Sequence, residues 1–139
     1  MNQVSSNGQS TLQSDLGLIL DDPFAQPYYK IESADAYYML GLRDLGISSA
    51  KKVVLIDPKN PTYLQVLATM QETAGNFSEA IMTRSTLTKY DPYNVKNYLQ
   101  LAKLYKQVGD RTSAIKMRDK IVELAPNSES AESVKAEIQ

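Results

Sequence analysis

The chain has 139 residues, of which 42% are hydrophobic and 22% are charged, with six glycines and six prolines. This length and balance are typical of one ordinary globular domain, and they exclude a collagen-like or globally disordered chain. The 15 Lys and Arg nearly cancel the 16 Asp and Glu, so no overall charge attracts nucleic acid, and no apolar run approaches the roughly 18 residues that span a bilayer.

Residues 1–26 precede the regular part of the sequence. Residues 1–9 are rich in Asn, Gln, Ser and Gly, which predicts a disordered leader, and they lack the basic start and apolar core of a signal peptide. In residues 10–26 a short apolar stripe precedes Asp22 and Pro23. The stripe consists of Leu12, Leu16, Ile19 and Leu20. We expect residues 10–26 to form an N-terminal capping helix or half of a truncated repeat.

A period of 34 residues runs through the rest of the chain. It separates Pro58, Pro92 and Pro126, and Gly75 and Gly109 keep the same spacing. On both sides of these glycines, apolar residues recur at the spacing of an amphipathic helix. A glycine with positive φ closes the first helix, and the proline ends the second because it has no N–H to donate. Each period therefore predicts a helix hairpin, and the fold class is all-α.

The period divides this part of the chain into three predicted units: residues 27–60, 61–94 and 95–128. Ser78 and Thr112, which follow the glycine turns, are expected to cap the second helices of the last two units. Ser128 begins a final amphipathic segment, residues 129–139, with apolar residues on one face. We expect this segment to be a C-terminal capping helix that covers the last hairpin.

These units resemble tetratricopeptide repeats (TPRs), whose 34 residues place small side chains where two helices cross and a proline near the end. The resemblance is strongest over residues 61–128 and weaker over residues 27–60. It implies a right-handed α-solenoid of about three TPR-like helix hairpins. Arg84 and Arg118 stand where the family has bulky residues. We expect their stems to pack on the core while their charged heads stay in water.

The resemblance implies that function resides in a concave groove lined by the first helix of each hairpin. In this family the groove holds a segment of another protein, so we predict a non-catalytic protein-binding scaffold or adaptor. The candidate groove residues are Tyr38 and Met39 of the first unit, Gln65, Val66 and Thr69 of the second, and Lys96, Leu99, Gln100, Lys103 and Lys106 of the third.

The third unit is the basic part of a nearly neutral chain. Residues 94–120 hold seven Lys or Arg against two Asp, whereas residues 121–139 hold one Lys against four Glu. A basic segment favours an acidic peptide or a terminal carboxylate as partner, and the alternative is a merely solvated helix face. The carboxylate clamp by which some TPR domains hold chaperone tails is not present. Gln65, Thr69 and Gln100 occupy positions where that clamp has Lys, Asn and Arg.

The first unit contains a cluster of four tyrosines. We expect Tyr29 and Tyr37 to pack between hairpins, and Tyr28 and Tyr38 to face the groove, where tyrosine is a common interface anchor. No run of the sequence interleaves basic and aromatic residues as base stacking requires. Nucleic acid is therefore not an expected partner.

The sequence holds no sign of catalysis. It has no Cys and no His, so the usual zinc ligands, activated nucleophiles and general bases are missing. Asp15, Asp21 and Asp22 lack the glycine turn and closing Glu of a calcium loop, and helix-end caps explain them better. We predict that the chain is not an enzyme and has no cofactor and no metal.

Two alternative roles stay open. The stretch from Leu20 to Phe24, leading into a degenerate hairpin, is similar to the soluble C-terminal TPR tails of bacterial membrane enzymes that assemble O-antigen and related surface polysaccharides. That resemblance implies a soluble domain tethered to a membrane protein without entering the bilayer itself. The second alternative is a self-associating scaffold, in which exposed end faces join copies of the chain.

Overall fold

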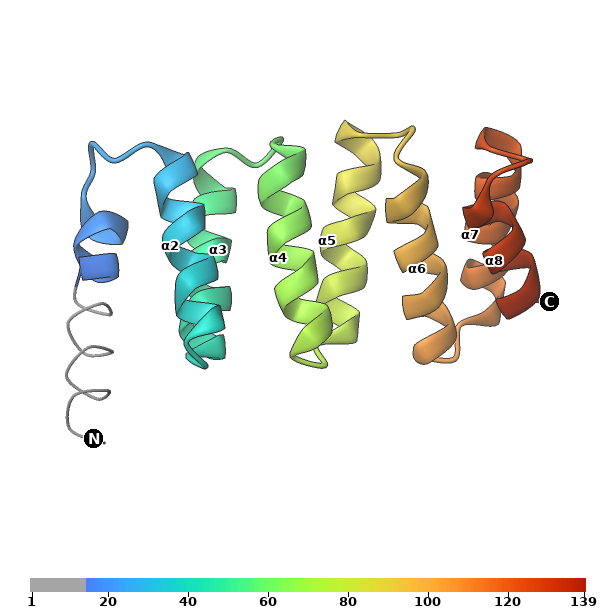
Figure 1. The fold of residues 1–139 in the computed structure, drawn as a ribbon, viewed down its shortest axis with the longest axis horizontal. Helices are drawn as coiled ribbons and strands as arrows, with labels where there is room; N and C mark the ends of the chain where they lie inside the picture. The colour runs from blue at the N-terminus through green and yellow to red at the C-terminus, as the bar shows by residue number, and fades with distance from the viewer. Residues whose placement is uncertain (1–14) are drawn as a thin grey trace. The chain divides into compact units, whose positions relative to one another are not determined.

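A computed structural model describes residues 15–139 (Figure 1). The predicted leader, residues 1–9, and Leu12 of the predicted stripe lie outside the described residues. From residue 15 onward all regular secondary structure is helical, so the all-α prediction is confirmed for this part of the chain. The chain divides into two compact units, Met1–Met70 and Gln71–Gln139.

In the first unit a short helix over residues 15–21 is followed by α2 (Pro27–Met39) and α3 (Arg43–Ile56). Helix α4 (Pro61–Thr73) begins in this unit and ends in the second. A proline at the start of α2 is well tolerated because the first N–H groups of a helix have no helical acceptor. Helices α2 and α3 form an antiparallel hairpin, closed by Gly41 with φ of 86° (Figure 1).

The close approach of α2 and α3 depends on Gly46. A Cβ at this position would lie 2.9 Å from the Cβ of Tyr38 and 3.0 Å from the carbonyl oxygen of Ala34. Any larger residue would therefore push the two helices apart. The buried apolar residues of this hairpin are Ile31, Ala34 and Tyr37 from α2, and Ile47, Ala50 and Val53 from α3.

The second unit contains the end of α4 and four further helices. They are α5 (Phe77–Tyr90), α6 (Val95–Gln107), α7 (Arg111–Leu124) and α8 (Glu129–Glu137). Helix α6 packs against α5, α7 and α8. Gly75 and Gly109, in the turns before α5 and α7, have φ of 80° and 82°, which confirms the predicted left-handed turns.

The predicted caps at Ser78 and Thr112 are wrong. Asn76 precedes α5 without a side-chain cap, and Asp110 precedes α7 and accepts hydrogen bonds from the Ser113 backbone N–H and hydroxyl. The residue after each turn glycine already has non-helical φ and ψ, so the helix begins one residue later, before Ser78 or Thr112 can act as cap.

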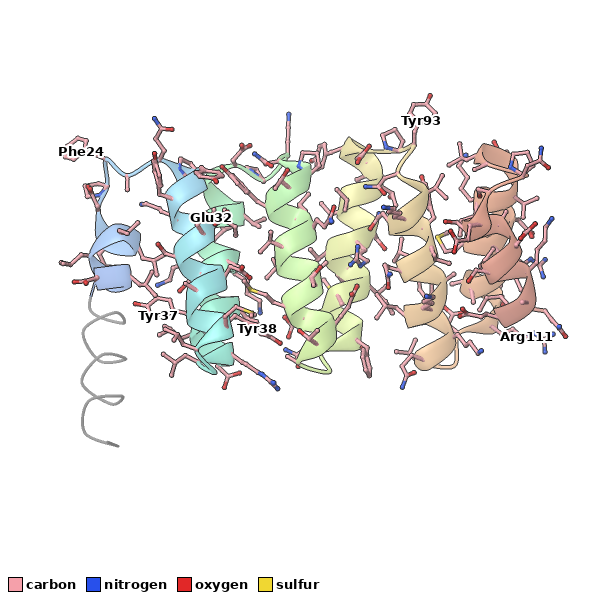
Figure 2. All side chains as sticks on the ribbon, in the orientation of Figure 1. Phe24, Glu32, Tyr37, Tyr38, Tyr93 and Arg111 are labelled. Carbon is pink, nitrogen blue, oxygen red and sulfur yellow. The ribbon has the colours of Figure 1, made fainter. Side chains whose placement is uncertain are left out.

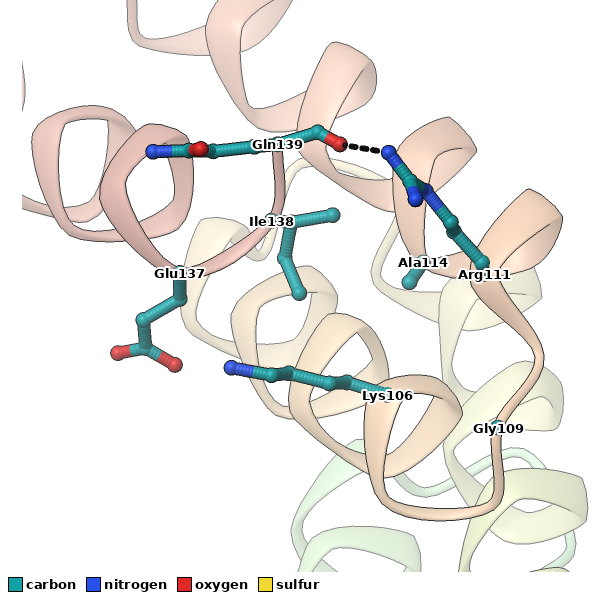
Figure 3. Close-up of a pocket in the computed structure, with 7 residues that line it drawn as sticks. All are labelled: Lys106, Gly109, Arg111, Ala114, Glu137, Ile138 and Gln139. Atoms are coloured by element: carbon teal, nitrogen blue, oxygen red, sulfur yellow. Dashed lines mark hydrogen bonds between the residues drawn. The ribbon is translucent and has the colours of Figure 1, made fainter.

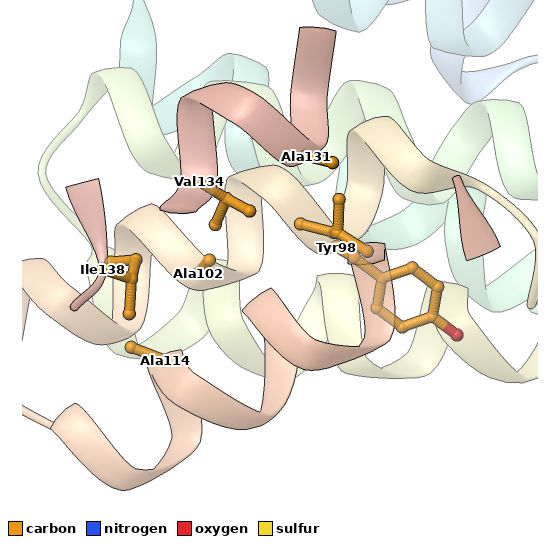
Figure 4. Close-up of a cluster of buried hydrophobic side chains, with 7 residues drawn as sticks. Tyr98, Ala102, Ala114, Ala131, Val134 and Ile138 are labelled. Carbon is orange, nitrogen blue, oxygen red and sulfur yellow. The ribbon is translucent and has the colours of Figure 1, made fainter. Parts of the chain in front are cut away.

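The core of the second unit joins α6, α7 and α8 (Figure 4). Ala102 and Ala114 are 0% and 1% exposed, and their small side chains let α6 and α7 pack closely. Helix α8 begins after Ser128, where the sequence predicts the start of the last segment, and the structure adds that the Ser128 hydroxyl accepts a hydrogen bond from the N–H of Ala131. Its predicted apolar face is buried. This face consists of Ala131, Val134 and Ile138.

Arg84 is buried, so the prediction that its charged head stays in water is wrong. Its guanidinium binds both carboxylate oxygens of Glu72, with Nη2 to Oε2 at 3.1 Å, and Nη1 donates to Oδ1 of Asn97 at 3.1 Å. This bidentate geometry replaces the lost water contacts. Arg118 is closer to the prediction, since its side chain is 26% exposed and pairs with Asp119 at the surface.

Candidate functional site

The five candidate residues of α6 lie along one side of that helix. Lys96, Lys103 and Lys106 are exposed, and Leu99 and Gln100 are half-buried between them. Their offsets from Lys96 are 3, 4, 7 and 10 residues, which return to the same helix face. Within residues 15–139 none of the three lysines forms an ion pair. These five residues are called the α6 stripe below.

Two acidic side chains of the second unit are already engaged by other groups. Glu72 is held by Arg84, which neutralises its charge within the unit. Asp110 accepts hydrogen bonds from the hydroxyl and N–H of Ser113, which together with the charge of Lys116 hold the pKa of its carboxyl below the ordinary value. Asp110 is therefore ionised at neutral pH, in its role as the cap of α7.

A pocket of about 390 Å³ lies beside the last residue of the α6 stripe (Figure 3). Lys106 and Arg111 line it together with Glu137, over an apolar floor of Ala114 and Ile138. Arg111 donates from Nη2 to the carbonyl oxygen of Gln139 at 2.8 Å. In Figure 3 the side chain of Lys106 extends toward the side on which Glu137 lies. The pocket therefore combines both signs of charge and is not a purely cationic site.

The other five candidate residues belong to the first unit. Gln65 and Thr69 are exposed on successive turns of α4, with the Thr69 hydroxyl donating to the Gln65 carbonyl oxygen at 2.9 Å, and Val66 is half-buried. Met39, at the end of α2, is 77% exposed. Tyr38 is half-buried on α2 (Figure 2).

Much of Tyr38 is committed to packing within its hairpin. Its Cβ lies next to Gly46, and the guanidinium carbon of Arg43 is 5.8 Å from the centroid of its ring. A cation at this distance is attracted by the face of the ring. Tyr38 is therefore partly used by its own hairpin, which the sequence pattern did not indicate.

The tyrosine predictions are partly correct. Tyr37 is buried, as expected, and this burial raises the pKa of its hydroxyl, with the charge of Asp21 adding to the effect. Tyr29 is 58% exposed, so its predicted packing role is wrong. It lies in the first turn of α2, where its ring packs edge-to-face on Tyr28 at 5.5 Å. Phe24, which was not among the candidate binding residues, is 91% exposed in the preceding loop (Figure 2).

In residues 15–139, no group of three or more acidic side chains is placed to hold a metal ion. In the same range, no helix has both the length and the apolar character needed to cross a bilayer.

Comparison with known proteins identifies the repeat. Residues 95–128 match the family model described as tetratricopeptide repeat, while no curated protein matches the chain.

Several solved structures, two of them described as TPR proteins, share the fold at low sequence identity. A tetratricopeptide repeat protein from Parabacteroides merdae has a TM-score of 0.77 and 20% identity over 91% of this chain and 49% of that one. The first TPR of Spaghetti (RPAP3), bound to the HSP90 peptide SRMEEVD, has a TM-score of 0.68 and 20% identity over 81% and 89%. The Yersinia enterocolitica type III secretion chaperone SycD, in complex with a peptide of the translocator YopD, has a TM-score of 0.64 and 16% identity over 78% and 92%. These likenesses establish a TPR-like helical repeat fold.

Proposed function

We propose that this chain is a non-catalytic interaction module that binds a peptide segment of another protein along the α6 stripe. The observation that carries the proposal is the alternation on α6 of exposed lysines without ion-pair partners among the described residues and half-buried Leu99 and Gln100. Lysines attract carboxylates, and a partly exposed leucine offers apolar contact. Two of the solved structures with this fold hold a bound peptide, which supports the same use of the fold here.

The spacing of the lysines indicates the acidic pattern that a partner needs. Lys96 and Lys103 are seven residues apart, or about 10 Å along the axis, and Lys103 and Lys106 are three apart, or about 4.5 Å. An extended peptide rises about 3.3 Å per residue. An extended partner that runs along α6 therefore needs two acidic residues about three positions apart to reach Lys96 and Lys103. A third acidic residue, one or two positions further along, reaches Lys106.

The charge contribution of this pairing is modest. An exposed ion pair stabilises a complex by about 0.2 to 1 kcal/mol, so three pairs together change affinity by roughly 3- to 150-fold. Because Glu72 is neutralised by Arg84, that carboxylate does not offset the lysines. The affinity is expected to fall as salt concentration rises, since exposed charges are screened.

The test is a peptide-display selection against the purified chain. The counter-selection uses the triple variant Lys96→Glu, Lys103→Glu, Lys106→Glu. A matched variant carries the same charge change on other helices of the unit, at Lys89, Lys116 and Lys135, which are all exposed. Circular dichroism first confirms that both variants are folded.

We expect the wild type and the matched variant to enrich peptides with acidic residues at the spacing given above, and the α6 variant to lose them. If the enriched peptides bound all three proteins equally, the lysines of α6 would have no role in binding. A folded wild type that enriches no peptide at all would contradict the proposed function.

The two alternatives from the sequence stay predictions. A tail of a membrane enzyme for surface polysaccharide assembly is not favoured by any contact in the two units or by the solved structures named above. Self-association is likewise not favoured by a specific contact. Light scattering over a range of concentrations measures self-association directly, and it accompanies the display experiment as a control.

A further inference from the structure

A second pocket, of about 190 Å³, lies entirely within the first unit. The short helix over residues 15–21, α2 and α3 each contribute to its wall. The pocket shares no residue with the α6 stripe or with any other groove candidate. It is therefore a separate feature whose role does not depend on the function proposed above.

The pocket has an apolar wall. Leu20 comes from the short helix, and Leu45 and Ile56 come from α3, which also contributes the buried Val53. Leu45 and Ile56 are 40% and 55% exposed, which leaves apolar surface open to a ligand. A concave apolar surface of this kind gains free energy when a ligand removes it from water.

Charged side chains also line the pocket. Lys30 of α2 and Lys52 of α3 both line it, and Asp21 lines it from the end of the short helix. Among the described residues neither lysine forms an ion pair. The lining therefore carries two positive charges and one negative charge next to an apolar wall. This combination fits a ligand with an anionic head and an apolar body.

We propose that this pocket binds an aliphatic carboxylate. The carboxylate lies beside Lys30 and Lys52, and the carbon chain lies against Leu20, Leu45 and Ile56. Asp21 repels the head group, so it favours the orientation in which the carboxylate is at the lysines. The ligand is therefore negatively charged at one end and apolar along the rest of its length.

The volume limits the size of the ligand. A volume of about 190 Å³ equals the share of roughly six water molecules in the liquid. A molecule of roughly six to eight non-hydrogen atoms fills this space, which corresponds to a short-chain acid such as hexanoate. The side chain, Cα and carboxylate of a leucine at the carboxyl end of a protein are of the same size and chemistry, and N-acetyl-leucine is the small probe for it, with its acetamide group extending out of the pocket.

The experiment is an NMR titration of the isotope-labelled chain with hexanoate, N-acetyl-leucine and hexylammonium. The amide signals of Lys30, Ser49 and Ile56 are expected to shift with the two acids and not with the amine. The acid that binds more tightly identifies the source of the carboxylate, a fatty acid or a protein terminus. Hexylammonium binding as tightly as the acids would contradict the assignment of charge.

Two pairs of neighbouring residues supply matched variants on α3. Lys52→Gln is compared with Lys51→Gln, and Ile56→Asp with Leu55→Asp, because only Lys52 and Ile56 line the pocket. We expect Kd for the tighter acid to rise about two- to fivefold in Lys52→Gln and about tenfold or more in Ile56→Asp. The two neighbouring variants are expected to stay close to the wild-type value.

Circular dichroism first shows that the variants are folded, so that a change in Kd reports on the pocket. Weaker binding confined to Lys52→Gln and Ile56→Asp supports the site. Equal losses in the neighbouring variants place the binding elsewhere and overturn it. The absence of any chemical-shift change with either acid overturns it as well.

Discussion

Replacing Glu72 by Gln tests whether the buried guanidinium of Arg84 depends on its carboxylate partner. The side chain of Arg84 is 6% exposed and that of Glu72 is 18% exposed. Glutamine keeps the shape and one acceptor oxygen but removes the negative charge. Arg84 would then be a buried cation without a counter-ion. Breaking a buried ion pair in this way costs about 3 to 5 kcal/mol.

Two features of the site place the expected cost at the lower end of that range. Water reaches part of Glu72, which weakens the electrostatic interaction. In addition, Asn97 still accepts a hydrogen bond from Arg84 at 3.1 Å, and Asn97 is itself held by donating to the Arg84 carbonyl oxygen. We expect Glu72→Gln to lower the free energy of unfolding by about 3 kcal/mol, a large share of the stability of a small domain.

Urea denaturation followed by circular dichroism measures this loss. The midpoint should fall while the slope stays constant, since the buried surface is unchanged. The control is Asp119→Asn, which removes the exposed partner of Arg118. The Asp119 side chain is 62% exposed, so its loss should cost less than about 1 kcal/mol. If the two variants lost the same free energy of unfolding, burial would not decide how much an ion pair stabilises this protein, and the reasoning would be refuted.

A double variant separates the charge from the packing. Arg84→Met combined with Glu72→Gln removes both charges and keeps much of the buried volume. We expect this variant to recover most of the stability that Glu72→Gln alone loses, because no unpaired charge remains. A double variant as unstable as the single one would show that the cost lies in packing or in the hydrogen bond to Asn97.

The remaining predictions concern four residues of the second unit. Leu101 is 1% exposed, and Leu101→Ala should lower the free energy of unfolding by about 2 to 5 kcal/mol because it leaves a cavity. Ala114→Leu should lower it by about 1 to 3 kcal/mol through overpacking. Urea denaturation measures both changes. Gly109→Ala should lower the free energy of unfolding by about 1 kcal/mol in the same measurement. Nothing lies within 4 Å of the added Cβ, so only the φ of 82° opposes it, and Gly109→Asn should cost less. Asp110→Ala should lower Tm at pH 7, because its carboxylate caps α7. The folded pKa of Asp110 lies below the ordinary 3.8, so its stabilisation is present above that pH and is lost as pH falls through the folded pKa. A difference in Tm that persists unchanged in strong acid would contradict this linkage.

The sequence was most informative where one short segment decides the structure. The 34-residue spacing of Gly75 and Gly109 predicts tight turns, because few residues other than glycine adopt positive φ, and both turns are present. The apolar spacing after Ser128 likewise predicts the helix α8 and its buried face. The resemblance to TPRs assigned the lysines of α6 to one helix face, and helical periodicity agrees with that assignment.

The sequence was least informative where a side chain meets a partner on another helix. Arg84 was expected to reach water, but Glu72 and Asn97, 12 and 13 residues away on neighbouring helices, bind it in the interior. Tyr29 was expected to pack, but the start of α2 at Pro27 places it in an exposed first turn. Neither outcome follows from periodicity, which gives the face of a helix but not the groups opposite it.

The sequence by itself therefore determined the helix hairpins, their turns and the polarity of the α6 face, because each depends on residues within one or two helical turns of one another. Only the tertiary structure decided which charges of residues 15–139 are neutralised inside the units and which have no ion-pair partner there. It pairs Glu72 with Arg84, leaves the lysines of α6 without ion-pair partners in the described part of the chain, and forms the pocket beside Lys52. These relations join residues from different helices, so they come from packing and not from local sequence.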